Sequence, residues 1–139
     1  MKIIEINENF DINSAEQETL YYIPVYEYNN TMQDYIDNMF YGRETKNNVV
    51  YCCSLRFITF DEDKKTALVN LKKGIEQYKK EFNDKLNGRK TISESVIEDL
   101  AKSNGGTFSF EEDDFTSFLF TVEISKSRNF AVYDIMTQL

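Results

Sequence analysis

The side chains of this chain that could do chemistry are two adjacent cysteines, a run of four acids and a few scattered carboxylates. The chain contains no histidine, which removes Ser-His-Asp catalysis, Cys-His catalysis and histidine metal sites from it. Cys52 and Cys53 are neighbours in a strand-like apolar stretch, so their side chains should face opposite sides of a sheet. They therefore cannot act as a pair, and two cysteines cannot build a structural zinc site. We expect two buried apolar thiols, no metal and no cofactor.

Four consecutive acids form the first candidate binding surface. Glu111, Glu112, Asp113 and Asp114 lie between two predicted strands, at a hairpin turn. The commonest role of such a run is a solvated turn. The functional alternative is a projecting acidic turn that imitates phosphates or binds a basic partner. A calcium loop is less favoured, because the ligand spacing of an EF-hand is missing. We take these four acids as candidate partner-binding residues.

Tyrosines form the second candidate surface, on a strand predicted over residues 19–28. Tyr22, Tyr26 and Tyr28 share one face of that strand. Pro24 cannot donate a hydrogen bond to a β-ladder, so we expect the strand at a sheet edge or bulged. Tyrosine is enriched at protein interfaces, although partial burial under a loop explains the same residues. These three tyrosines are therefore candidate partner-binding residues, and the edge could also support a homodimer.

Lysines on the predicted central helix are a third feature. Lys65, Lys72 and Lys79 repeat every seven residues, and Lys73 and Lys80 lie beside two of them. Such a stripe is most often a solvated helix face that is balanced by neighbouring glutamates. A contact with phosphate or with an acidic partner is the alternative.

Carboxylates alone could also support a small enzyme. Glu27, Asp34 or Glu123 could serve as an acid or a base if they lie in a cleft with tyrosines. The chain has five glycines, and none of them forms a phosphate-binding loop or a dinucleotide fingerprint. Two carboxylates with perturbed pKa values in one pocket would favour this enzyme, and a convex acidic surface would favour a binding protein.

Length and composition predict one domain over residues 1–139. Hydrophobic residues make up 41% of the chain and charged residues 29%, which is typical of a globular protein. No apolar run reaches the roughly 20 residues that span a bilayer, and the first residues lack a signal-peptide pattern, so we expect a cytoplasmic protein. The net charge is −8, with acids in excess over residues 1–48 and 105–139. Such a surface repels nucleic acid and favours basic partners.

Residues 49–86 organise the predicted fold. Residues 49–60 are apolar on both faces and rich in Val, Tyr, Phe and Ile, which indicates a central strand. Apolar residues then recur at steps of three and four from Leu68 to Leu86, which indicates a long helix that begins near three acids and ends before Gly88. Gly74 inside this helix predicts a close contact with another backbone.

The remaining elements complete an α+β fold with the order ββαβααβββ. We expect a mostly antiparallel sheet, with the long central helix, two shorter helices and a C-terminal meander of three strands. The other predicted strands cover residues 1–6, 19–28, 107–110, 115–124 and 130–136, and the shorter helices cover residues 31–42 and 91–104.

These observations favour a small acidic protein that binds and inhibits a basic, nucleic-acid-handling protein. The analogy is with phage or mobile-element proteins that block a host defence nuclease, in the manner of anti-CRISPR or anti-restriction proteins, and it rests on size, acidity and missing catalytic groups. The alternatives are an immunity protein that neutralises a toxin, the carboxylate enzyme described above, and a self-associating structural subunit. We expect no direct contact with nucleic acid and none with a membrane.

Overall fold

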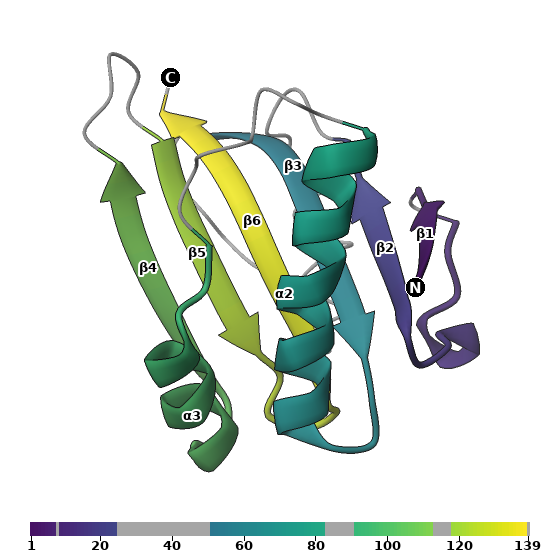
Figure 1. Cartoon of the computed structure of the whole chain (residues 1–139), viewed down its shortest axis with the longest axis vertical. Helices are drawn as coiled ribbons and strands as arrows, with labels where there is room; N and C mark the ends of the chain where they lie inside the picture. Colours follow the sequence, from purple (N-terminus) through teal and green to yellow (C-terminus); the bar gives the residue numbers. More distant parts are fainter. Residues whose placement is uncertain (8, 25–50, 83–90, 113–117, 139) are drawn as a thin grey trace.

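A computed structural model describes residues 1–7, 9–24, 51–82, 91–112 and 118–138. In these residues a six-stranded sheet with the order β1-β2-β3-β6-β5-β4 carries two α-helices (Figure 1). β1 and β2 are parallel, and the other neighbouring pairs are antiparallel. The elements are β1 (Lys2–Glu5), η1 (Ile12–Ser14), β2 (Thr19–Ile23), β3 (Tyr51–Phe60), α2 (Lys64–Glu81), α3 (Glu94–Lys102), β4 (Gly106–Glu112), β5 (Phe118–Ile124) and β6 (Phe130–Gln138).

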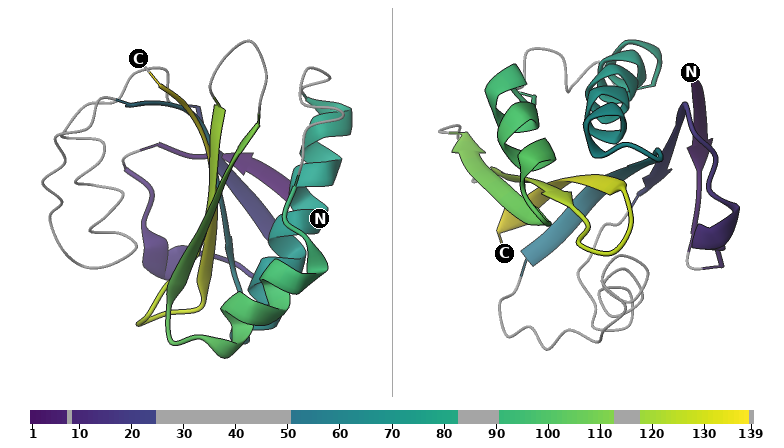
Figure 2. Two further views of the ribbon diagram at one scale, coloured as in Figure 1. Left: turned by 90° about the vertical axis from the view of Figure 1, so that its left-hand side faces the viewer. Right: turned by 90° about the horizontal axis from the view of Figure 1, so that it is seen from below.

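The arrangement is the predicted α+β architecture with a mixed sheet. Figure 2 shows α2 and α3 on the same side of the sheet. The three C-terminal strands pair in chain order, β4 with β5 and β5 with β6, both antiparallel. Their bounds differ from the predicted ones, and the predicted helix over residues 31–42 lies outside the described residues.

β3 is the central strand that the sequence predicts. It lies between β2 and β6 and is antiparallel to both. Leu55 and Phe57 belong to the core under the helices, whereas Ile58 belongs to a second apolar cluster on the opposite face. All three side chains are buried. Successive side chains of a strand point to opposite faces of the sheet. Because side chains on both faces of β3 are buried, both faces of the sheet must be covered there.

Helix α2 packs its apolar stripe across the sheet. Leu68, Leu71 and Ile75 have no exposed surface and share one core cluster with Phe57 of β3 and Tyr133 of β6. These helix residues recur at steps of three and four, so they lie on one face. The predicted buried face of the long helix is therefore confirmed over these residues.

Hydrogen bonds to Asp63 fix the start of α2. Its carboxylate accepts hydrogen bonds from the Thr66 backbone N–H at 3.0 Å and from the Thr66 hydroxyl at 2.8 Å. These bonds lower the pKa of the Asp63 carboxyl, because they favour its charged form. At the other end Phe82 is the C-cap and is 56% exposed, and Tyr78 is the last buried apolar residue of the helix. The predicted cap at Gly88 lies outside the described residues.

β2 differs from its predicted form, because it is an interior strand rather than an edge or bulged one. It ends at Ile23, and β1 lies outside it as the first strand of the sheet. Pro24, which suggested the edge, follows the last residue of the strand and so removes no hydrogen bond from the ladder. The parallel pairing of β1 joins residues that are distant in sequence, and a local pattern in β2 does not reveal it.

β4 also differs, because it continues into the acidic run. Glu111 and Glu112 were predicted in the hairpin turn, but they pair with Leu119 and Phe118 in the ladder with β5. Ladder hydrogen bonds are made by the backbone, so a change to acidic residues need not end a strand. Asp113, the next residue of the run, lies outside the described residues.

Gly74 marks a close approach of α2 to β2. A Cβ atom at this position would lie 3.0 Å from the Leu20 Cβ atom and 2.9 Å from the Met1 sulfur. The close contact that the sequence predicts is therefore present, but it is made with side chains rather than with a backbone. It holds the helix tightly against the β1–β2 end of the sheet.

Candidate functional site

The two predicted binding surfaces lie at different ends of the sheet. Glu111 and Glu112 end β4, the last strand, whereas Tyr22 lies in β2, and β3, β6 and β5 separate the two strands. Figure 1 shows β4 and β2 apart from each other across the sheet. The structure therefore does not bring the acids and this tyrosine into one site. The other predicted residues, Asp113, Asp114, Tyr26 and Tyr28, lie outside the described residues.

Tyr22 takes part in an aromatic cluster beside α2. Its ring lies 5.1 Å from the ring of Tyr78 and 6.4 Å from that of Phe82. Burial raises the pKa of the Tyr22 hydroxyl, and the nearby negative charge of Glu5 raises it further. The side chain is half-buried, so Tyr22 contributes to packing between β2 and the end of α2 rather than standing on a free edge.

β4 presents the open edge of the described sheet. It pairs with β5 alone among the strands that the structure describes. Phe108 is 42% exposed, and Thr107 and Ser109 beside it are also exposed. Phe110 is half-buried and stacks on Phe120 of β5 at 5.1 Å. A long exposed edge of this kind is a template for pairing with another chain.

A small cavity lies next to this edge, between β4 and the start of α3. Its volume is about 230 Å³, and Phe108 and Phe110 form its sheet side. Ser93 is the N-cap of α3, and its hydroxyl accepts a hydrogen bond from the Val96 backbone N–H at 3.3 Å. The cavity therefore has a fixed helical wall beside an exposed phenylalanine. Its lining residues are Thr91, Ile92, Ser93, Val96, Phe108 and Phe110.

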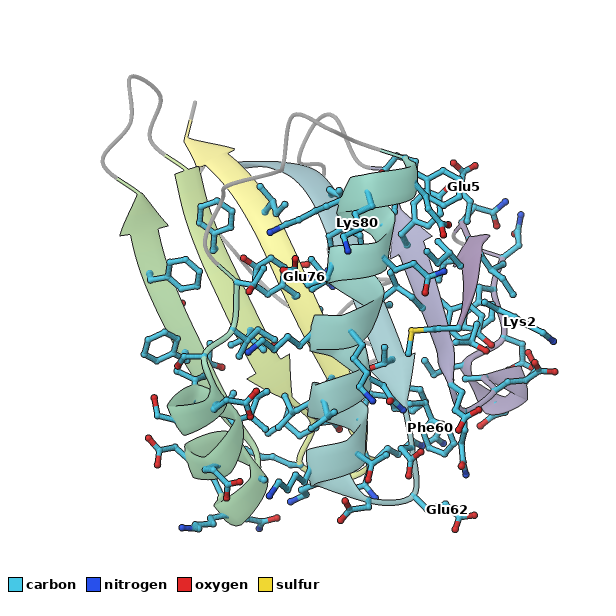
Figure 3. The ribbon with its side chains drawn as sticks, viewed as in Figure 1. Lys2, Glu5, Phe60, Glu62, Glu76 and Lys80 are labelled. Atoms are coloured by element: carbon cyan, nitrogen blue, oxygen red, sulfur yellow. The ribbon has the colours of Figure 1, made fainter. Side chains whose placement is uncertain are left out.

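A larger cavity of about 490 Å³ lies between α2 and α3. Lys72, on its rim, pairs with Glu94 of α3 at 3.2 Å. Figure 3 shows Glu76 and Lys80, two further lining residues, on α2. The cavity therefore has an apolar floor and a rim of mixed charge. Its lining residues are Val69, Lys72, Lys73, Glu76, Gln77, Lys80, Glu94 and Ile97.

The lysine stripe is only partly the solvated face that the sequence predicts. Lys65 is exposed and pairs with Glu98 at 2.6 Å, which raises the pKa of the Lys65 amine and lowers that of the Glu98 carboxyl. Lys79 is different, because only 4% of its surface is exposed. Its amine lies 3.6 Å from the Glu76 carboxylate. Lys79 therefore corrects the prediction of a uniformly solvated stripe.

A buried ion pair joins the two central strands. Arg56 of β3 donates two hydrogen bonds to Asp134 of β6, from Nε to Oδ1 at 2.6 Å and from Nη2 to Oδ2 at 2.5 Å. Both residues are buried, and they are opposite each other in the ladder. In the sequence Arg56 only interrupts an apolar stretch. A single charge in each of two apolar strands is the one signal that could have suggested the pair.

The carboxylates that suggested an enzyme are not brought together in the described residues. Glu123 lies in β5 and is half-buried, whereas Glu27 and Asp34 lie outside the described residues. Within the described ranges, His, Cys, Asp and Glu side chains form no group of three that could hold a metal ion. The described helices include none that is both long enough and apolar enough to cross a membrane.

No known protein family, curated protein or solved structure matches this chain. Among the described surfaces, the β4 edge combines three features that a binding site needs. It is a seven-residue strand with a single ladder partner among the described strands, it has an exposed phenylalanine beside a cavity, and it holds the start of the acidic run. Sequence reasoning found the acids but missed Phe108, because the open edge follows from strand order and not from any local pattern.

Proposed function

We propose that this protein is a small acidic protein-binding module that inhibits a basic, nucleic-acid-handling protein. The observation that carries the proposal is the place of the acidic run. Glu111 and Glu112 end β4, one of the two edge strands of the described sheet, and Asp113 and Asp114 follow them directly in the sequence. A partner can approach this end of β4 without displacing the core under α2.

The sign of the charge suggests the kind of partner. Proteins that bind nucleic acid neutralise its phosphates with Lys and Arg, and a run of carboxylates offers the same negative charge to such a surface. The net charge of −8 adds a long-range attraction that speeds encounter with a basic protein. A host defence nuclease is a target of this type, and a phage or mobile-element inhibitor would act by occupying its basic surface.

The test is affinity capture from lysate of the native host, followed by mass spectrometry. We expect the wild-type chain to retain a basic protein with a nucleic-acid-binding surface. A variant with Glu111→Gln, Glu112→Gln, Asp113→Asn and Asp114→Asn should lose that protein while remaining folded, because each replacement removes a charge and keeps nearly the same side-chain size.

The matched control removes the same amount of charge elsewhere. Glu5, Glu16, Glu18 and Glu62 are exposed, and Glu5 lies at the β1 end of the sheet (Figure 3). Replacing these four with Gln should leave capture nearly unchanged. Equal loss in both variants would mean that overall charge, and not the end of β4, attracts the partner. Unchanged capture by the 111–114 variant would reject this surface, and a captured toxin would favour an immunity protein.

A further inference from the structure

The middle of β4 lacks the features that normally protect a sheet edge. From Gly106 to Phe110 the strand contains no charged residue and no proline, which are the usual blocks to edge pairing. The opposite edge is different, because β1 has four residues and two of them, Lys2 and Glu5, are charged. Phe108 adds exposed apolar surface to the β4 edge, whereas the exposed Ile4 of β1 lies between the two charged residues of that strand. Of the two edges, β4 is therefore the one suited to pairing.

The two ends of β4 differ in the charged residues around them, and Glu123 of β5 lies opposite Thr107 in the ladder. Glu111 and Glu112 lie at its C-terminal end. At its N-terminal end, Lys102 is the last residue of α3, and Lys126 packs against Gly105, the residue just before the strand. A segment that pairs along the whole strand therefore needs a neutral middle, one basic end and one acidic end. An antiparallel copy of β4 has these three parts in the required order.

We infer that β4 pairs antiparallel with β4 of a second copy of this chain, in a register centred on Ser109. In this register Ser109 is opposite its own copy, and Phe108 is opposite Phe110 of the second copy. Opposite residues of an antiparallel pair share a face of the sheet, so the four phenylalanines meet on the helix side. Aromatic pairs of this kind stabilise strand pairing.

The same register matches the charges and covers the cavity beside β4. Glu112 is opposite Gly106 of the second copy, next to the end of the strand where Lys102 and Lys126 lie. The cavity of about 230 Å³ lies under Phe108 and Phe110, where the phenylalanines of the second copy arrive. A dyad perpendicular to the sheet relates the two copies, as in other isologous dimers.

A basic extended segment of another protein is the competing occupant. It would meet Glu111 and Glu112 favourably, but it would also bring positive charge towards Lys102 and Lys126. This argument favours the second copy. The inference does not rest on the proposed function, since the purified chain alone tests it.

Cysteine crosslinking tests the register. Ser109→Cys places two thiols opposite each other, at a Cβ separation of about 4.5–5.5 Å. Thr107→Cys is the matched control, because it lies two residues away on the same strand and its copy would be about 13 Å distant. Under mild oxidation, Ser109→Cys should form covalent dimers at least about tenfold faster than Thr107→Cys or the wild type, since disulfides require close Cβ atoms. Equal rates for all three would overturn the inference.

Sedimentation equilibrium tests the contact without new thiols. Phe108→Glu puts a charge on the edge and should abolish the dimer that the wild type forms as concentration rises. Phe82→Glu is the control, because Phe82 is 56% exposed but caps α2 at a distance from β4. It should leave the dimer intact. A wild type that stays monomeric at every concentration, or equal weakening by both substitutions, would contradict pairing through β4.

Discussion

At the centre of the sheet, β3 and β6 are buried on both faces, whereas β4 at the edge leaves Phe108 42% exposed and ends in Glu111 and Glu112. The central pair has a ladder partner on each side, and the ion pair of Arg56 with Asp134 is buried between its strands. The edge strand has one described partner and exposed side chains. We therefore expect stability to depend on the centre, and we expect the edge to tolerate change and to bind other molecules.

Among the changes that test this difference between centre and edge, we expect loss of the central ion pair to have the largest effect on stability. Asp134→Ala leaves the Arg56 guanidinium without its bidentate carboxylate in a buried position. The free energy of unfolding should fall by about 3–5 kcal/mol, because removing one partner of a buried, hydrogen-bonded ion pair is costly. Urea unfolding followed by circular dichroism measures it.

Two controls accompany that substitution. Asp99→Ala removes an exposed carboxylate of α3 and should change the free energy of unfolding by less than about 0.5 kcal/mol. Replacing both partners, with Arg56→Met and Asp134→Leu, should recover most of the stability. If Asp134→Ala lowers the free energy of unfolding no more than Asp99→Ala does, the ion pair contributes nothing to stability. The central strands would then differ less from the edge than described.

The next effect concerns the helix that covers the centre. Leu71 has no exposed surface, so Leu71→Ala should lower the free energy of unfolding by about 2–5 kcal/mol through lost burial and a cavity. Lys73→Ala, on the exposed side of the same helix, should cost within about 0.5 kcal/mol. Equal urea midpoints for the two variants would show that α2 does not pack as described.

A smaller effect tests the β1–β2 end of the sheet, where α2 packs closely against Leu20 and Met1. Gly74→Ala gains up to about 1 kcal/mol of helix propensity, but its methyl group meets Leu20 Cβ at 3.0 Å. Overpacking costs about 1–3 kcal/mol, so we expect a net loss of about 1 kcal/mol. The thermal midpoint should fall relative to Lys73→Ala. A rise would mean that β2 and α2 separate easily, and that this end is no tighter than the β4 edge.

The centre of this fold could be predicted from the sequence because its signals are local. The stripe from Leu68 to Tyr78 follows the period of a helix, and the two-sided apolar pattern of residues 49–60 indicates a central strand. The pair of Arg56 with Asp134 could not be predicted, since the two residues are 78 positions apart and only the ladder register brings them together.

The candidate site was predictable in part for the same reason. A run of four acids is visible in any reading of the sequence, but its place on the outermost strand depends on the order of all six strands. For the tyrosine-rich strand, the sequence predicted an edge where the structure has an interior strand. Pro24 suggested an edge, yet the parallel pairing of β1 with β2 makes that strand interior. Edges are properties of the whole sheet, and short patterns do not determine them.

We propose that the centre of the sheet provides stability and that the acidic end of β4 binds the partner. The most direct test is the association rate of the captured partner with the wild type and with the 111–114 variant, measured by surface plasmon resonance from low to high salt. We expect similar melting temperatures, an association rate lowered about tenfold in the variant at low salt, and convergence as salt screens the charges. Equal association rates without salt dependence would contradict the claim.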